Sequence, residues 1–200
     1  MPDLLEELAR GIRSCPRCDL CHARTYAVPG EGPADAEVMF IGEAPGFYED
    51  QQGRPFVGAA GKFLEQLLSL VGLRREEVYI TNVIKCRPPD NRDPLPKELE
   101  ACRSWLEQQV ALLKPKVVVT LGRYSLAHFF PGESMSKAHG QARFRDGVCY
   151  VPMYHPAAAL HQERYRSLIE DDFRKLPAAL AEARRGVPAE AAEPQQMRLF

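Results

Sequence analysis

Four of the six cysteines in this chain are spaced like the ligands of one metal centre. Cys15 and Cys18 form a Cys-x-x-Cys pair near the N-terminus, and Cys86 and Cys102 lie far along the chain, on either side of residues 87–101. Four thiolates suit either zinc or an iron–sulfur cluster. Zinc sites mostly use two Cys-x-x-Cys pairs, so the wide second spacing favours a cluster. A centre that joins distant segments fixes how the chain closes.

Other interpretations of the cysteines stay open at this point. Cys21 lies close enough to Cys18 to compete as a ligand, whereas Cys149 lies in an apolar stretch and is expected to be a buried apolar residue. The alternative to a metal centre is a set of reduced, buried thiols. The stiff polar segment 87–89 (Arg-Pro-Pro) directly follows Cys86, which argues against a plain core thiol at that position.

The composition limits the kinds of protein to which this chain can belong. The chain has 200 residues, of which 45% are hydrophobic and 26% charged, and its formal net charge is −1. These values are typical of one globular domain. A nearly neutral protein has no overall positive field, so any DNA site needs local positive charge. No apolar run reaches membrane-spanning length and no signal peptide opens the chain. Because six cysteines without a secretion signal indicate a reducing compartment, we expect a cytoplasmic protein. We also expect a monomer.

Short β-branched runs alternate with segments of helical periodicity. Helices are expected over residues 61–71, 96–113 and 122–130, and strands over residues 38–41, 78–81, 117–121 and 148–151. Runs that are apolar on both faces are typical of a parallel sheet covered by helices on both sides. The sequence therefore predicts an α/β fold, a three-layer α/β/α sandwich around a central, mostly parallel four-stranded sheet. We expect one domain over residues 1–184 and a flexible Ala-, Glu-, Pro- and Gln-rich tail over residues 185–200.

Polar and glycine-rich residues follow three of the predicted strands. Residues 42–46 (Gly-Glu-Ala-Pro-Gly) follow the first strand, Asn82 follows the second, and His155 follows the fourth. In open parallel sheets, ligands bind at the carboxyl ends of the strands. The sequence therefore predicts a site that brings these residues together, although the glycine turn alone is equally consistent with a purely structural strand-to-helix connection.

The motifs taken together resemble those of the family 4 uracil-DNA glycosylases, the iron–sulfur branch of the uracil-DNA glycosylase superfamily. The matching segments, in the family's order, are Cys15-Pro-Arg-Cys18, residues 42–46, Gly53-Arg-Pro-Phe-Val-Gly58, Thr81-Asn-Val-Ile-Lys-Cys-Arg-Pro-Pro89, Cys102 and His155-Pro156. The resemblance implies a monofunctional enzyme that flips deoxyuridine out of DNA, hydrolyses its N-glycosidic bond and leaves an abasic site. It also implies a structural [4Fe-4S] cluster on Cys15, Cys18, Cys86 and Cys102.

Roles for single residues follow from this resemblance. Phe56 is expected to stack on the flipped uracil, and Asn82 to read its edge by donating to O4 and accepting from N3–H. His155, with backbone N–H groups of Gly42, Glu43 and Ala44, is expected to stabilise negative charge on uracil O2. Glu43, ahead of Glu49, is expected to orient the attacking water or stabilise the sugar cation.

The chain also departs from its relatives. Family 1 enzymes of the superfamily carry an aspartate at the position of Ala44 and a tyrosine at the position of Gly46, so the exclusion of thymine must come from other groups. Leu160 is what remains of the family's leucine pair, and it is the predicted wedge in the DNA stack. The predicted phosphate contacts around the pocket are Arg54, Lys85 and Arg87.

Two further expectations concern partners and class. The segment Gln196-Met-Arg-Leu-Phe200 resembles the short peptide by which bacterial repair proteins bind the sliding clamp, although its apolar side chains could instead fold back on the domain. The second function to be weighed is a non-catalytic iron–sulfur module that binds DNA or a base. The presence of Glu43, Asn82 and His155 favours the enzyme, because a pure binder needs no group aimed at the leaving oxygen.

Overall fold

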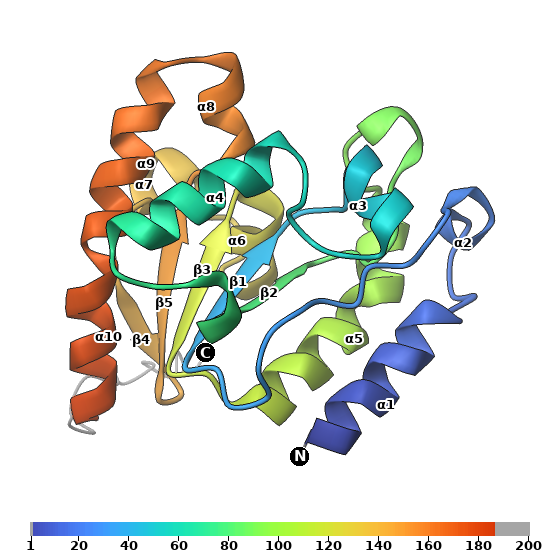
Figure 1. The fold of residues 1–200 in the computed structure, drawn as a ribbon, viewed down its shortest axis with the longest axis horizontal. Coiled ribbons are helices and arrows are strands. Elements are labelled where there is room, and N and C mark those ends of the chain that lie inside the picture. Colours follow the sequence, from blue (N-terminus) through green and yellow to red (C-terminus); the bar gives the residue numbers. More distant parts are fainter. Residues whose placement is uncertain (1, 187–200) are drawn as a thin grey trace, which may run out of the picture.

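The computed structural model describes residues 2–186 of the chain, with side chains from residue 4 onward. Within this range one mixed sheet forms the centre of the molecule, with the strand order β2-β1-β3-β5-β4 (Figure 1). Its strands are β1 (Val38–Gly42), β2 (Tyr79–Asn82), β3 (Val117–Leu121), β4 (Arg143–Arg145) and β5 (Val148–Met153). The four predicted strands are all present, and they pair in parallel.

Helices cover both faces of the sheet, which confirms the three-layer prediction. Alternate residues of β1 point to opposite faces, because side chains in a strand alternate. Phe40 packs with the helices α4 (Ala59–Leu70), α9 (Arg164–Arg174) and α10 (Leu176–Arg185), and Met39 packs with α5 (Pro96–Leu113) and α6 (Arg123–Phe129). Burial on both sides explains why these strands are apolar throughout.

The sheet has one more strand than the sequence predicted. The additional strand, β4, pairs with β5 in the antiparallel direction at the edge of the sheet within the described residues. It spans only three residues, and two of these are arginines, so neither length nor hydrophobic pattern marks it as a strand. Short, charged strands are common at sheet edges, where they discourage pairing with other chains.

The remaining elements are short or peripheral. Helix α1 (Pro2–Arg13) and the single-turn helix α2 (Leu20–Ala23) pack against α5 around a third apolar cluster, which contains Ile12, Ile84, Cys86 and Cys102. Two helices follow strand ends, α3 (Phe47–Gln52) after β1 and α8 (Ala157–His161) after β5. The others are α7 (Met135–Ala138) and the 3₁₀ turns η1 (Arg75–Glu77) and η2 (Pro89–Asn91).

The C-terminal predictions lie largely outside the described residues. Helix α10 ends at Arg185. The expected tail and its last segment, Gln196–Phe200, fall beyond residue 186, so both stay predictions. Among the described residues, no helix combines the length and the apolar character needed to cross a bilayer.

Candidate active site

The segments that follow the strands bring four predicted residues together at the carboxyl edge of the sheet. Gly42 at the end of β1 is directly opposite Asn82 at the end of β2. A Cβ atom on Gly42 would lie 2.3 Å from Asn82 Oδ1 and 2.8 Å from the ring of Phe56. The ring of Phe56 stacks on that of His155, with 5.4 Å between centroids and an interplanar angle of 26°. Gly42 is therefore required because a side chain would fill the space between Asn82 and Phe56.

Asn82 carries an unusual buried group. Its Oδ1 atom is shielded from solvent and accepts no hydrogen bond from any described residue. Leaving a buried acceptor unpaired costs about 1–3 kcal/mol, and native proteins rarely tolerate it without reason. The oxygen is therefore free to accept a hydrogen bond from a ligand that binds at this place.

His155 has a defined tautomer. Its Nδ1 accepts a hydrogen bond from the backbone N–H of Ala157 at 3.1 Å, so Nε2 carries the proton and is the donor. Burial lowers the pKa of His155 to about 4, and the negative charge of Glu49 only partly opposes this effect. At neutral pH His155 is therefore an uncharged donor, which can hydrogen-bond a developing oxyanion without a change in protonation.

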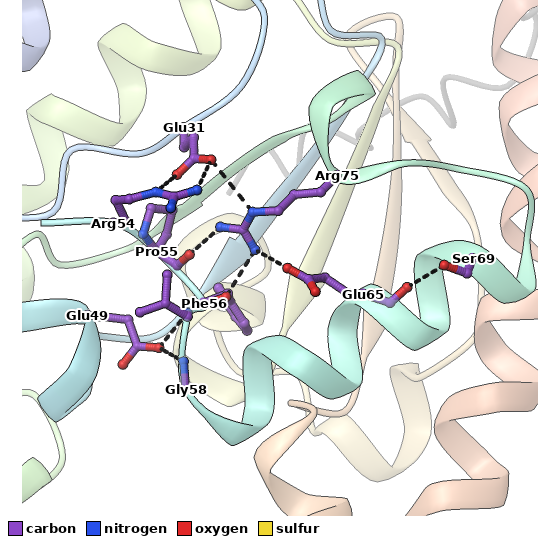
Figure 2. A network of polar contacts seen from close by, with 10 residues as sticks. Glu31, Glu49, Arg54, Pro55, Phe56, Gly58, Glu65, Ser69 and Arg75 are labelled. Carbon is purple, nitrogen blue, oxygen red and sulfur yellow. Dashed lines mark hydrogen bonds and ion pairs between the residues drawn. The ribbon is translucent and has the colours of Figure 1, made fainter. Parts of the chain in front are cut away.

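The backbone of Phe56 is held in a strained conformation. Its φ of +50° lies in the left-handed region, which a bulky residue seldom adopts. Figure 2 shows the guanidinium of Arg75 donating to the carbonyl oxygens of Phe56 at 3.0 Å and Pro55 at 2.5 Å. Gly61 leaves room for the same carbonyl, because a Cβ there would lie 1.9 Å from it. Strain of this kind persists only where surrounding contacts fix it, and it is concentrated at functional sites.

The two candidate glutamates are placed differently. Glu43 follows Gly42, and its Oε1 accepts a hydrogen bond from the backbone N–H of Tyr124 at 3.1 Å. Burial raises the pKa of Glu43, and the N–H of Tyr124 partly offsets this effect. A Cβ on Gly122 would come within 2.5 Å of the carboxylate, so this glycine makes room for it.

Glu49 is engaged with the backbone instead. Its Oε1 accepts from the N–H groups of Val57 and Gly58, both at 2.8 Å, and its Oε2 accepts from Gly46 N–H at 3.1 Å. Figure 2 shows the contact between Glu49 and Gly58, which fixes the segment that follows Phe56. Since these three bonds use both carboxylate oxygens, the geometry favours Glu43 over Glu49 as the group that acts on a water.

The four predicted ligand cysteines lie on segments that meet around α5. Cys86 and Cys102 are buried in the same cluster as Cys18. Arg24 donates to Cys86 Sγ at 3.0 Å, and the indole N–H of Trp105 donates to Cys15 Sγ at 3.3 Å. Burial raises the pKa of Cys102 to about 11.

All the cysteines are free thiols, and Cys149 is buried in β5 as predicted. Among residues 2–186, no group of three or more His, Cys, Asp or Glu side chains has the arrangement needed to hold a metal ion.

Three of the predicted DNA contacts lie at the surface. Leu160 on α8 is exposed, as a wedge must be. Arg54 is also exposed and forms a two-bond ion pair with Glu31, with both distances 2.8 Å. The guanidinium of Arg87 donates to Asn91 Oδ1 at 2.7 Å.

The prediction for Lys85 is wrong. Its side chain is only 1% exposed, so it cannot reach a phosphate. Its ammonium donates to Thr81 Oγ1 at 2.7 Å, to the carbonyl oxygen of Asn82 at 2.6 Å and to Gln109 Oε1 at 2.7 Å. Burial lowers the pKa of Lys85 to about 7, an effect that the nearby thiols of Cys102 and Cys86 oppose. Lys85 therefore ties the end of β2 to α5.

The backbone between Asn82 and Cys86 is anchored as well. The N–H groups of Val83 and Ile84 donate to the carbonyl oxygens of Gly42 and Glu43, at 3.0 and 3.2 Å. On the other side of this segment, Val28 N–H donates to the carbonyl oxygen of Lys85 at 2.7 Å. The predicted base reader and the predicted cysteine ligand therefore belong to one continuous, fixed strand extension.

Sequence reasoning missed two aromatic residues beside the candidate site. Phe47 and Tyr48, the first residues of α3, are both largely exposed. Their position in the sequence was the available signal. Two adjacent large aromatic residues directly after a glycine turn do not belong to an apolar periodic pattern, so the sequence gives no reason to expect them to be buried.

Comparison with known proteins agrees with this geometry. The family model described as the uracil DNA glycosylase superfamily matches residues 29–181. The type-4 uracil-DNA glycosylase of Sulfurisphaera tokodaii is 48% identical over 184 residues, which cover 87% of this chain and 84% of that protein. The type-4 enzyme of Archaeoglobus fulgidus is 45% identical, with 86% and 91% covered. A type-5 enzyme from Thermus thermophilus is 40% identical over 51% of this chain and 55% of its own length. The chain therefore belongs to the uracil-DNA glycosylase superfamily, among the type-4 enzymes.

Proposed function

We propose that Asn82, Phe56 and His155 form the uracil pocket of this enzyme, and that Glu43 directs the attacking water. As a uracil-DNA glycosylase, the protein excises uracil from DNA and acts as a hydrolase in DNA repair. The observation that carries the residue assignment is the unpaired, buried Oδ1 of Asn82. The N3–H of uracil would supply the missing donor. Cytosine has an acceptor at that position, so it would leave the oxygen unpaired.

The chemistry follows from the placement of the donors. As the bond between C1′ and N1 breaks, its electron pair moves into the uracil ring and charge develops on O2. The Nε2–H of His155 would donate to this oxygen in a buried setting, where a preorganised donor is most effective. A water would add its oxygen to C1′, and the one proton that it loses would pass first to Glu43 and then to the uracil anion. The raised pKa of Glu43 suits a carboxyl group that receives a proton from this water.

The test is single-turnover cleavage of an oligonucleotide that contains one deoxyuridine, either single-stranded or opposite guanine. Alkali-labile breaks are expected at uracil and not at cytosine or thymine in matched strands. Breaks at thymine would show that the pocket does not exclude the 5-methyl group. The absence of breaks at uracil would overturn the catalytic assignment and favour a module that only binds DNA.

We further propose that Cys15, Cys18, Cys86 and Cys102 hold a [4Fe-4S] cluster of structural function. The donor chemistry supports this proposal, because the four residues are free thiols on segments that meet around α5 and the sulfurs of Cys86 and Cys15 receive hydrogen bonds from Arg24 and Trp105, although the described side chains are not arranged around one metal position. Hydrogen bonds to sulfur are a usual feature of such centres. When bound, the cluster would join the N-terminal segment to α5. Four reduced thiols also fit a cytoplasmic location.

Replacing Cys86 with serine is expected to abolish bound iron and to lower the thermal midpoint. Cys149→Ser is the matched control, because this cysteine is buried in the sheet and is not one of the four proposed ligands. This variant would lose some packing, but the protein would keep its bound iron. Iron and sulfide content and visible absorption measure occupancy independently of activity. Equal iron content in both variants would contradict the cluster assignment.

Binding of a sliding clamp through Gln196–Phe200 is part of the same proposal. Its basis is the sequence pattern alone, a Met-x-Leu-Phe motif that follows a polar segment. A peptide of residues 190–200, tested against the purified clamp, would decide the question. No binding at high micromolar concentration would remove this partner.

A further inference from the structure

Two adjacent aromatic side chains form an exposed patch beside the uracil pocket. Phe47 is 50% exposed and Tyr48 is 60% exposed. Their rings meet edge to face, with 5.5 Å between centroids and an angle of 82°. Single exposed apolar residues are ordinary, but contiguous apolar surface at the entrance of a site is typical of a contact with a ligand or partner.

The patch is fixed to the pocket by short connections. Helix α3 directly follows the turn at residues 42–46, and Tyr48 Cδ2 lies 3.4 Å from the position of a Cβ on Gly58. Gly58 in turn is two residues from Phe56 and is hydrogen-bonded to Glu49 on α3. Figure 1 shows α3 and α8 on opposite sides of the carboxyl ends of the central strands. The helix that carries the aromatic patch and the helix that carries Leu160 therefore lie on different sides of these strand ends.

One positive charge lies directly on the patch. The guanidinium of Arg87 lies over the ring of Phe47, 5.2 Å from its centroid. The two carboxylates of α3 point away from this surface: Glu49 bonds to backbone N–H groups, and the buried Asp50 accepts from Thr25 N–H at 2.9 Å. The remaining residues of α3 are neutral glutamines.

We propose that Phe47 and Tyr48 are a stacking platform for unpaired bases next to the flipped deoxyuridine, with Arg87 contacting the adjoining phosphate. The proposal rests on uracil excision by this family and names a determinant of its substrate form. Every base offers a π-face to an aromatic ring, so such platforms bind single strands with little regard to sequence. In a duplex those faces are covered by neighbouring base pairs. The platform therefore favours uracil in single-stranded DNA over uracil in a duplex.

The test compares the affinity of the protein for an oligonucleotide with one tetrahydrofuran abasic site, single-stranded and in duplex form. Base–aromatic stacking contributes about 1–3 kcal/mol per base, which corresponds to roughly 5- to 150-fold in the dissociation constant. The double variant Phe47→Ser/Tyr48→Ser is expected to weaken single-strand binding by at least the lower of these factors. Duplex binding is expected to change much less. Leu70→Ser, an exposed apolar residue at the far end of α4, is the control and leaves both affinities unchanged.

The salt dependence separates stacking from charge. The slope of log Kd against log salt is expected to stay unchanged in the aromatic variant, because no phosphate contact is lost. It is expected to fall by about one in Arg87→Gln. Tyr48→Phe is expected to keep wild-type affinity, since a phenyl ring stacks as well as a phenol.

A fluorescent base locates the contact. 2-Aminopurine placed next to the abasic site is expected to be quenched on binding to the wild-type protein and not on binding to the double variant. Unchanged single-strand affinity, or equal weakening for single strand and duplex, would overturn the proposal. So would a change of oligomeric state without a change in DNA binding, which would make the patch a contact between copies. These binding measurements use uncleavable DNA, so a failure of catalysis would not be mistaken for a failure of the platform.

Discussion

Replacing His155 with alanine is expected to lower the single-turnover rate of uracil excision by about 10²–10³-fold. The reason is that the Nε2 proton, fixed by the hydrogen bond from Ala157 N–H to Nδ1, is a preorganised donor on the ring that stacks on Phe56. Affinity for abasic DNA is expected to stay within a few-fold of wild type, because the donor acts on charge that develops as the bond breaks. A variant that loses affinity but cleaves at the wild-type rate would assign His155 to binding alone.

The same histidine gives a pH signature. With a pKa of about 4 in the folded protein, His155 stays neutral through the range in which an ordinary histidine titrates. The excision rate is therefore expected to show no step near pH 6.5 that can be assigned to His155. Its pH profile in that range should be the same in the wild type and in His155→Gln.

The free energy of unfolding depends on the titration of His155 in a different way. The unfolded chain takes up a proton at its ordinary pKa of about 6.5, so stability is retained above that pH and lost as the pH falls from there toward 4. His155→Gln removes this part of the slope in urea titrations; an equal slope in both proteins would contradict the lowered pKa.

Replacing Asn82 with leucine is expected to reduce uracil excision by about 10⁴-fold. A site built to hydrogen-bond its substrate loses roughly this factor when donor and acceptor no longer match. The stability of the unliganded protein is expected to stay the same or rise, because a buried oxygen without a donor is replaced by an apolar group of similar size. Thermal unfolding and single-turnover kinetics measure the two effects separately.

Thr120 provides the matched control for this variant. Its Oγ1 is the other buried side-chain oxygen that lacks a partner among the described residues, and it lies within β3. Thr120→Val is expected to have a similar effect on stability and none on excision. If Asn82→Leu instead unfolded the protein at a much lower temperature, Asn82 would have a structural function, and the assignment of its oxygen to the substrate would fall.

The parts of the fold that sequence could predict are those where one local pattern decides the outcome. The strand at residues 117–121 is fully buried, and its continuous run of β-branched and apolar residues predicts this. Strand β4 could not be predicted, since Arg143 and Arg145 leave no apolar signal and the pairing partner β5 decides its structure. Local pattern therefore decides the four parallel strands, and tertiary pairing decides β4.

The site shows the same division. Asn82 and His155 were predicted from their positions after strands together with the family resemblance. The prediction for Lys85 failed because its acceptors come from elsewhere in the chain: Gln109 lies on α5, and nothing near Lys85 in the sequence announces it. The left-handed backbone of Phe56 depends likewise on Arg75, from a separate 3₁₀ turn. Such features need the three-dimensional structure because the groups that enforce them are distant in sequence.

The anchored segment from Asn82 to Cys86 has a consequence for how this enzyme can change over evolutionary time. Inserting or deleting one residue there would shift Asn82 relative to Cys86 and break the bonds that Val83 and Ile84 make to the turn after β1. Descendants can therefore exchange side chains in this segment but cannot alter its length. Gains and losses of residues should collect instead in exposed turns, such as residues 131–134 between α6 and α7.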